Sequence, residues 1–310
     1  MRYVLITPAR NESAFIHETL ESMVAQSCKP ERWVIVDDGS DDNTPVIVED
    51  YCAKNSWVKL IKMPKRRQRN FAGKVQAFNA GFADVADCTF DLIGNLDADI
   101  SFGPDLFQFL LQKFTDDKDL GVAGTAYTQD GWESTRDSFE GEVSVHGACQ
   151  LFRRECFADI GGYTPNPAGG IDWIAVTTAR MRGWKTRNFP ERRFHHHRTM
   201  GTAERGPIGA MYDYGKKDYF LGGSPLWELF RVAYRATKKP YILGGMALFA
   251  GYLLSAARRT DRAVSDELMR FHRREQHTRL SQMLRSLLTS ASIENYYIQR
   301  SEDISAKRGR

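Results

Sequence analysis

Several signals that place a chain in a specialised class of protein are missing from this sequence. The five cysteines, at positions 28, 52, 88, 149 and 156, are odd in number and irregularly spaced, and no Cys-x-x-Cys pair occurs. The first apolar run, residues 3–6, is too short for a signal-peptide core. Internal repeats and low-complexity tracts are also absent. We therefore expect reduced thiols and a cytoplasmic protein rather than a disulfide-bonded or repeat protein.

Charge is unevenly distributed along the chain. Residues 1–205 contain 25 Lys/Arg and 29 Asp/Glu, whereas residues 206–310 contain 18 and 10. The basic C-terminal third indicates either an acidic partner, such as a membrane surface, nucleic acid or a phosphorylated acceptor, or only a solvated helical face. The length of 310 residues permits one large or two modest domains.

Short apolar runs alternate with helix-compatible stretches through the first half of the chain. The predicted strands are residues 3–7, 33–37, 58–61 and 90–96, and the predicted helices are residues 14–26, 44–53 and 74–85. This rhythm predicts an α/β fold with a mostly parallel sheet and flanking helices. Strand signals vanish near Gly206, so we predict one α/β domain over residues 1–205. Residues 206–310 would form a helical region with a disordered tail after Glu302.

Acidic side chains follow two of the predicted strands. In Asp37-Asp38-Gly39-Ser40, the acids can accept hydrogen bonds from a base imide or a ribose hydroxyl. The next residues, 41–43, are interpreted as a turn and a helix cap. In Asp97-Ala98-Asp99, carboxylates two residues apart on extended backbone point to the same side. Such a pair can hold a hard divalent cation against a diphosphate.

The ordered set of motifs resembles family-2 glycosyltransferases of the GT-A fold. It comprises Pro-x-x-Asn-Glu at residues 8–12, Val-Asp-Asp-Gly-Ser-x-Asp-x-Thr at residues 36–44 and Asp-Ala-Asp at residues 97–99. The similarity continues at residues 73–81, 149–154 and 160–163, and it covers roughly residues 3–200.

The resemblance implies inverting transfer of a sugar from a nucleotide-sugar donor. Asp38 would read the base with Asp37 nearby, while Asp97 and Asp99 would manage Mg²⁺ or Mn²⁺. Lys74 would contact the phosphates, or would be a plain surface lysine of a helix. The implied nucleotide-binding residues are Pro8, Ala9, Arg10, Glu12, Asp37, Asp38, Lys74, Asp97 and Ala98.

An inverting displacement needs a general base, and in the family an acid after the Gly-Gly-Tyr turn fills that role. Asp172 is the candidate here, with capping of the following helix as its alternative role. Trp173 would be an acceptor platform or a core residue.

Three consecutive histidines precede Arg198. On extended chain His195 and His197 share a face and His196 opposes them. The resemblance implies that His195 and Arg198 contact the diphosphate and that His197 could join the metal ligands. The alternatives are a partly exposed loop with no ligand role and a zinc site, for which no cysteine pair or carboxylate lies at suitable spacing.

The second region contains an uncharged stretch, residues 240–257, between Lys238-Lys239 and Arg258-Arg259. It is at the short limit for a membrane-spanning helix, so we expect a helix in the membrane plane or a re-entrant one, with a buried core helix as the alternative. Residues 226–235 resemble an amphipathic helix. Residues 265–276 also look helical, and their arginines would bind a lipid-linked phosphate or simply face solvent.

The predicted enzyme is a metal-dependent inverting glycosyltransferase of the hexosyltransferase type. Its acceptor would be a polyprenyl-linked saccharide or a similar molecule at the inner face of the cell membrane, as in surface polysaccharide assembly. The expected partners are the nucleotide sugar, this acceptor and the membrane surface, without nucleic acid.

A nucleotidyltransferase is less compatible with the sequence, because residues 7–12 are not rich in glycine. A non-catalytic membrane scaffold would not need Asp97, Asp99 and Asp172. The Gln-x-x-Arg-Trp element of processive relatives is absent, which favours single addition.

Overall fold

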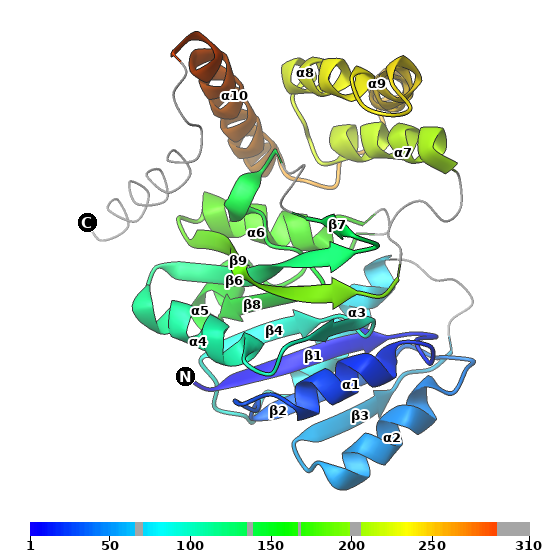
Figure 1. Ribbon diagram of the computed structural model, residues 1–310, viewed down its shortest axis with the longest axis vertical. Coiled ribbons are helices and arrows are strands. Elements are labelled where there is room, and N and C mark those ends of the chain that lie inside the picture. The colour runs from blue at the N-terminus through cyan, green and yellow to red at the C-terminus, as the bar shows by residue number, and fades with distance from the viewer. Residues whose placement is uncertain (66–70, 135–138, 167–168, 199–205, 290–310) are drawn as a thin grey trace. The chain divides into compact units, whose positions relative to one another are not determined.

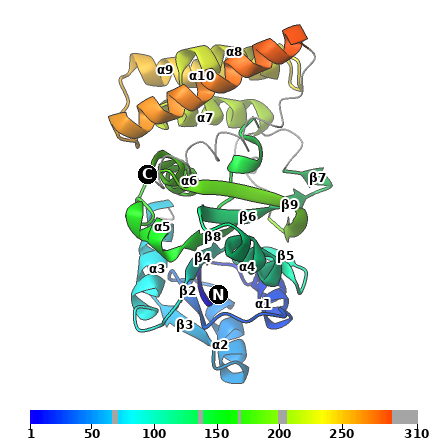
Figure 2. The ribbon, with the colours of Figure 1, turned by 90° about the vertical axis from the view of Figure 1, so that its left-hand side faces the viewer.

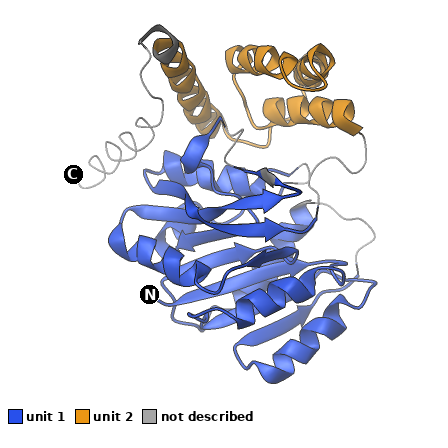
Figure 3. Cartoon of the chain, viewed as in Figure 1, with its two compact units in different colours: residues 1–198, 301–310 blue, residues 199–300 orange. Residues whose placement is uncertain are grey.

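The computed structural model describes residues 1–65, 71–134, 139–166, 169–198 and 206–289. These residues fall into two compact units, one that ends at Arg198 and one that begins at Gly206 (Figure 3). The disorder predicted after Glu302 lies outside the described residues.

The first unit is built on one sheet whose strand order is β3-β2-β1-β4-β8-β6-β9-β5, with β7 paired to β6 (Figure 1). The strands are β1 (Tyr3–Ala9), β2 (Arg32–Asp37), β3 (Val58–Lys62), β4 (Leu92–Leu96), β5 (Ile100–Phe102), β6 (Leu120–Gln129), β7 (Trp132–Glu133), β8 (Cys149–Arg153) and β9 (Lys185–His196). Strands β3, β2, β1 and β4 run parallel, whereas β8 is antiparallel to β4 and β6. The predicted α/β fold with flanking helices is confirmed.

Helices cover both faces of this sheet (Figure 2). The helices are α1 (Ile16–Val24), α2 (Thr44–Lys54), α3 (Phe71–Asp84), α4 (Leu106–Asp116), α5 (Arg154–Asp159) and α6 (Ile171–Met181), and the short 3₁₀ helix η1 spans Gly141–Val143. One apolar core joins α1, α2 and α4 to one face, and a second core joins α3, α5 and α6 to the other. Strands buried on both faces explain why β1, β2 and β4 read as nearly continuous apolar runs.

The parallel strands of the sheet bring the predicted site residues together at their carboxyl ends. Because β1, β2 and β4 are parallel neighbours, their carboxyl ends lie together and lead into the loops that contain Glu12, Asp38 and Asp97. Hydrogen bonds join the first two loops: the Asn11 amide donates to Ser40 Oγ at 2.9 Å, and the Glu12 amide donates to Thr44 Oγ1 at 2.8 Å. These hydrogen bonds therefore hold the two loops together at the carboxyl ends of β1 and β2.

The observed elements differ from the predicted ones mainly at their ends and beyond residue 100. The first helix runs from Ile16 to Val24 instead of over residues 14–26, and β4 begins at Leu92 instead of residue 90. Strands β5, β6, β7, β8 and β9 were not predicted, and neither were helices α4, α5 and α7. Strand β9 mixes charged and exposed residues with Pro190, so it lacks the apolar run that marks the buried strands.

The second unit is helical and comprises α7 (Gly206–Phe220), α8 (Pro225–Ala236), α9 (Ile242–Ala257) and α10 (Asp266–Thr289). Helices α7 and α9 cross closely at two glycines. A Cβ atom on Gly251 would collide with the Tyr212 carbonyl oxygen, and one on Gly215 would collide with the Leu248 carbonyl oxygen. Among the described residues, no helix is both long enough and apolar enough to span a bilayer.

Candidate functional site

A pocket with about 550 Å³ of empty space, partly open to solvent, lies at the carboxyl ends of β1, β2 and β4. Its lining residues are Pro8, Ala9, Arg10, Glu12, Asp38, Lys74, Asp97, Ala98 and Asp99. Residues from three separate strand ends and from α3 thus meet around one space. The pocket contains every residue predicted to bind the nucleotide except Asp37.

Asp37 and Asp38 diverge although they are adjacent in sequence. Asp38 lines the pocket, whereas the buried Asp37 carboxylate accepts hydrogen bonds from the Ser40 amide at 3.2 and 3.4 Å. Gly39 makes this turn possible, because its φ is +72° and a Cβ would lie 2.7 Å from the Lys65 Cα. In this structure Asp37 shapes the turn that presents Asp38.

Asp42, just after this turn, stabilises the loop through hydrogen bonds. Both carboxylate oxygens of Asp42 accept hydrogen bonds, from the Ser13 amide at 3.0 Å and from Thr44 Oγ1 at 2.6 Å. Burial favours the protonated acid, but these hydrogen bonds outweigh it and lower the pKa of Asp42 to about 2.

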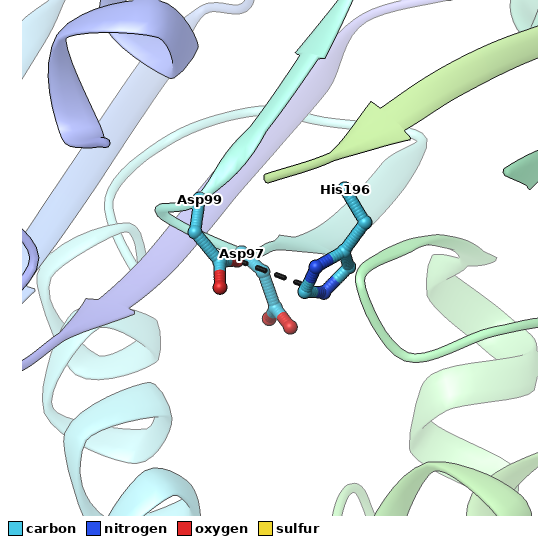
Figure 4. A group of neighbouring side chains, drawn as sticks. All are labelled: Asp97, Asp99 and His196. Carbon is cyan, nitrogen blue, oxygen red and sulfur yellow. Dashed lines mark ion pairs between the residues drawn. The ribbon is translucent and has the colours of Figure 1, made fainter. Parts of the chain in front are cut away.

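Two carboxylates and one imidazole form a candidate metal centre. One ligand atom from each of Asp97, Asp99 and His196 lies within 4.8 Å of the others (Figure 4). His196 Nε2 is 3.8 Å from Asp99 Oδ1. The antiparallel pairing of β5 with the end of β9, which aligns Ile100 with His196, brings the histidine to the Asp-x-Asp turn.

The histidine in this group differs from the expected one. His197 was predicted as a ligand, but its Nε2 hydrogen bonds to Ser101 Oγ at 2.9 Å and its ring stacks against Phe15. His195 was predicted to contact the diphosphate, yet it is exposed and its Nδ1 pairs with Thr128 Oγ1 at 3.2 Å. Phe194 could have supplied the missing signal, because this buried apolar residue shares the inward face with His196.

The orientation of His196 suits metal binding. Its Nδ1 lies 2.8 Å from the Arg198 carbonyl oxygen, which can only accept a hydrogen bond. A neutral imidazole therefore carries its proton on Nδ1 and directs the Nε2 lone pair toward the carboxylates, as is usual for a ligating histidine. The donor set of two carboxylates and one imidazole fits a divalent cation.

Lys74 lies within the group of acids rather than on an open helix surface. Its Nζ is 2.5 Å from Asp97 Oδ1. Burial works to lower the pKa of Lys74, but the charge and hydrogen bond of Asp97 and the charges of Asp172 and Asp99 outweigh it and raise the pKa. The ammonium group is thus held in its charged form at the pocket.

Arg198 links Asp99, in the candidate metal centre, to Glu12, in the loop after β1. Arg198 Nη2 is 2.5 Å from Glu12 Oε2, and Arg198 Nε is 3.4 Å from Asp99 Oδ2. Burial, followed by the neighbouring charge of Asp97, raises the pKa of Asp99 in spite of the opposing charges of His196, Arg198 and Lys74. Arg198 therefore lies beside two of the pocket residues, and its contact with the diphosphate stays a prediction.

Asp172 is the second residue of α6 and belongs to the same electrostatic group. The helix begins after Gly170, and no side chain in the described part of the chain caps it. The Asp172 carboxylate instead accepts a hydrogen bond from the Gly147 amide at 3.2 Å, and its charge helps to raise the pKa of Lys74. The neighbouring Trp173 donates its indole N–H to Glu140 Oε1 at 2.8 Å.

Sequence reasoning missed two polar residues near this acid. His146 packs edge-on against Tyr127 at 4.7 Å between ring centroids, and burial lowers its pKa in spite of the charges of Asp172 and Glu140. Asn95, near the end of β4, contacts Asp97 through its amide. No local motif marks either residue, because His146 meets Tyr127, and Asn95 meets the Gly147 carbonyl, only when distant segments fold together.

Comparison with known families finds a match within the first unit. The family model for glycosyl transferase family 2 matches residues 4–144. Two curated relatives are poly-β-1,6-N-acetyl-D-glucosamine synthases. The chain is 25% identical to that of Staphylococcus epidermidis over 170 residues, which are 49% of this chain and 39% of that protein. It is 28% identical to that of Staphylococcus aureus over 112 residues, which are 36% of this chain and 25% of that protein. The chain thus spans well under half the length of these relatives.

Solved structures share the fold at low sequence identity. The mannosyltransferase PcManGT from Pyrobaculum calidifontis, in complex with GDP-Man and Mn²⁺, has a TM-score of 0.55 at 19% identity over 98% of this chain and 84% of that chain. Staphylococcus aureus TarS 1–349 in complex with UDP-GlcNAc has a TM-score of 0.53 at 14% identity over 98% and 89%. GalNAc-T7 with UDP, GalNAc and Mn²⁺ has a TM-score of 0.56 at 14% identity over 93% and 57%.

Proposed function

We propose that this glycosyltransferase, whose residues 4–144 form a glycosyl transferase family 2 domain, moves a sugar from a nucleotide-diphosphate donor to a lipid-linked saccharide at a membrane surface. The observation that carries the transfer step is the meeting of Asp97, Asp99 and Lys74 in one pocket at the parallel strand ends. GDP-Man and UDP-GlcNAc, bound by structures of the same fold, support a nucleotide sugar as donor.

Residues in the pocket and beside it would have different roles in binding the donor. Asp38 would accept hydrogen bonds from the base or the ribose, and Lys74 and Arg198 would supply positive charge for the two phosphates. Asp97, Asp99 and His196 would hold Mg²⁺ or Mn²⁺, and the mixed oxygen and nitrogen ligands favour Mn²⁺. When bound, the cation would supply a Lewis acid that neutralises charge on the diphosphate.

Asp172 is the proposed general base. It would accept the proton of the acceptor hydroxyl while that oxygen forms a bond to the anomeric carbon. The bond from the anomeric carbon to the diphosphate oxygen breaks on the opposite face, and the nucleoside diphosphate leaves with its electron pair. This displacement inverts the anomeric centre. The hydrogen bond from the Gly147 amide fixes one carboxylate oxygen, and the other is available to the acceptor.

The proposed membrane surface rests on helix α9, which has two apolar faces. Gly244, Leu248 and Tyr252 lie on the face that is buried within the second unit. The opposite face exposes large apolar side chains at helical spacing, with Ile242 67% and Met246 61% exposed. The exposed apolar residues are Ile242, Leu243, Met246, Phe249, Leu253 and Leu254.

The distribution of charge supports an anionic membrane as the occupant of this face. No acidic residue occurs in residues 240–257, and basic pairs precede and follow the helix. The helix is 16 residues long, or about 24 Å at the rise of an α-helix, which is shorter than a bilayer core of about 30 Å. An orientation in the membrane plane therefore suits it, with the basic pairs at the lipid headgroups. A lipid-linked acceptor would be presented at the same surface.

Flotation of the protein with lipid vesicles tests the membrane proposal. We expect wild type to float with phosphatidylglycerol vesicles and to float less with phosphatidylcholine vesicles. The double variant Ile242→Asp/Met246→Asp should stay at the bottom of the gradient, because it places two carboxylates on the face that would enter the lipid.

Val46→Asp is the matched control, since Val46 is also an exposed apolar residue but lies on α2 of the first unit. It should float like wild type. If wild type does not float with either vesicle, or if the double variant floats equally well, α9 is not a membrane-binding helix.

The acceptor class is tested by the product. Radiolabelled donor incubated with membrane lipid extract should give labelled product that partitions into organic solvent. Labelled product found only in the aqueous phase would refute a lipid-linked acceptor and leave the transferase activity intact.

A further inference from the structure

Asn95 is a buried polar residue with two acceptors in the proposed active site. It is 3% exposed and lies in β4, where a buried amide is costly unless it is hydrogen bonded. Its Nδ2 is 3.0 Å from Asp97 Oδ1 and 2.5 Å from the Gly147 carbonyl oxygen. Both partners are acceptors, so the two N–H bonds of the amide are both used and its orientation is determined by chemistry.

Gly147 continues the connection from Asn95 to Asp172. Its carbonyl accepts from Asn95, and its amide donates to Asp172 Oδ2 at 3.2 Å. A Cβ at position 147 would lie 2.8 Å from the Asp172 Cβ and 2.9 Å from Oδ2. Any side chain here must therefore displace Asp172, because both contacts are closer than real Cβ atoms allow.

The segment that contains Gly147 is held firmly at both ends. The Gln150 side chain donates to the Val145 carbonyl at 2.7 Å, and the Asp97 amide donates to the Ala148 carbonyl at 2.8 Å. The fully buried Gln150 in turn accepts a hydrogen bond from the Tyr163 hydroxyl at 2.7 Å. Fixed in this way, the segment can transmit the position of one carboxylate to the other.

We infer that Asn95 and Gly147 are positioning residues that hold the metal-binding carboxylate of Asp97 and the base Asp172 at a set separation. The inference rests on the proposed function, in which the donor and the acceptor hydroxyl must be aligned for displacement. Misplacement of a catalytic group by about 1 Å can cost about 100-fold in rate. Residues that orient metal ligands typically contribute about 10- to 100-fold in metal affinity or activity.

The two residues should fail in different ways when they are changed. Asn95→Leu keeps the approximate volume but removes both donors, so Mn²⁺ binding should weaken about tenfold or more. This is measured by calorimetric titration of Mn²⁺ in the presence of UDP or GDP, without acceptor or turnover. Gly147→Ala should leave Mn²⁺ binding within about twofold and lower kcat about 100-fold, because it displaces only the base.

Asn188→Leu is the matched control, because Asn188 is an equally buried asparagine of the same sheet and is not part of this chain of hydrogen bonds. It should keep both Mn²⁺ binding and kcat, and melting temperatures should show that all three variants are folded. If Asn95→Leu does not fold, Asn95→Asp makes the same test by replacing the donor with an acceptor that repels Asp97.

The inference is overturned if folded Asn95 variants bind Mn²⁺ like wild type, or if Gly147→Ala retains wild-type kcat. If the proposed function is wrong, wild type will transfer no sugar. Calorimetric titration of the Asn95 variants with Mn²⁺ would still test whether Asn95 positions a metal ligand.

Discussion

Two adjacent histidines have different environments at the candidate metal centre. His196 is buried beside Asp99 with its Nε2 facing the carboxylates, whereas His197 lies against Ser101 and Phe15. Alternation along extended chain correctly separates the two residues onto opposite faces. Which face meets Asp97 and Asp99 depends on the pairing of β5 with β9, and that pairing brings together residues almost a hundred positions apart.

Substitution of each histidine tests this difference. His196→Ala should raise the Mn²⁺ concentration for half-maximal activity by about 10- to 100-fold, because one ligand is lost. His197→Ala, as the matched variant, should change it by less than about threefold, since the His197 ring bonds to Ser101 and not to the candidate metal ligands.

Initial rates over a Mn²⁺ series measure both effects. A larger effect at His197 than at His196 would show that the histidine nearest the acids in this structure is not the ligand.

The residues that line the candidate donor pocket were largely predictable from sequence. Pro8, Asp38 and Asp97 follow predicted strands, and parallel strands must bring their carboxyl ends together. The sequence could not show which of Asp37 and Asp38 lines the pocket. The two residues have the same side chain, and the turn at Ser40 decides which carboxylate reaches the pocket.

At the scale of elements, helix α8 contains an acid whose protonation is coupled to folding. Glu228 is buried, and burial, followed by the charge of Asp218, raises its pKa from the usual 4.5 to about 8 in spite of Arg231. The folded state therefore binds this proton more tightly than the unfolded chain does. Its contribution to stability is complete below about pH 4.5 and is lost as the pH rises to about 8.

Glu228→Gln mimics the protonated acid and should remove most of this dependence. At pH 8 the variant should be more stable than wild type by roughly 1 to 3 kcal/mol. This is less than the free energy that corresponds to the whole pKa change of Glu228, because Asp218 and Arg231 interact with the same proton. Near pH 4.5 the two should be equal. Denaturant titrations followed by circular dichroism measure the difference.

Glu267→Gln on α10 is the control, because Glu267 is exposed. It should not change the dependence of stability on pH. Parallel stability curves for wild type and Glu228→Gln across this range would contradict a buried, protonated Glu228.

Helices were easier to predict than the later strands, and the reason is physical. Helix α9 was visible as an uncharged stretch and α8 as an amphipathic one, because helical periodicity is local. Strand β9 pairs in parallel with β6 across a register shift and antiparallel with β5. Neither partner is close in sequence, so its mixed residues carry no local signal.

At the scale of the whole molecule, the pocket and the exposed face of α9 belong to different units. The residues of the pocket lie within the match to the glycosyl transferase family 2 model, and this similarity could be read from ordered motifs. The acceptor could not be read in the same way, because its recognition depends on surfaces and not on a motif of catalytic residues.

The most direct test of the central claim is release of nucleoside diphosphate from a panel of nucleotide sugars. It is run with Mn²⁺, Mg²⁺ or chelator, and with membrane lipid extract as the source of acceptor. We predict release from one donor with wild type, loss of release in chelator, and a decrease of at least about 100-fold in Asp99→Asn, because the variant removes a metal-binding charge. Equal release in chelator or by Asp99→Asn would contradict the metal site, and no release from any donor would contradict the proposed transferase reaction.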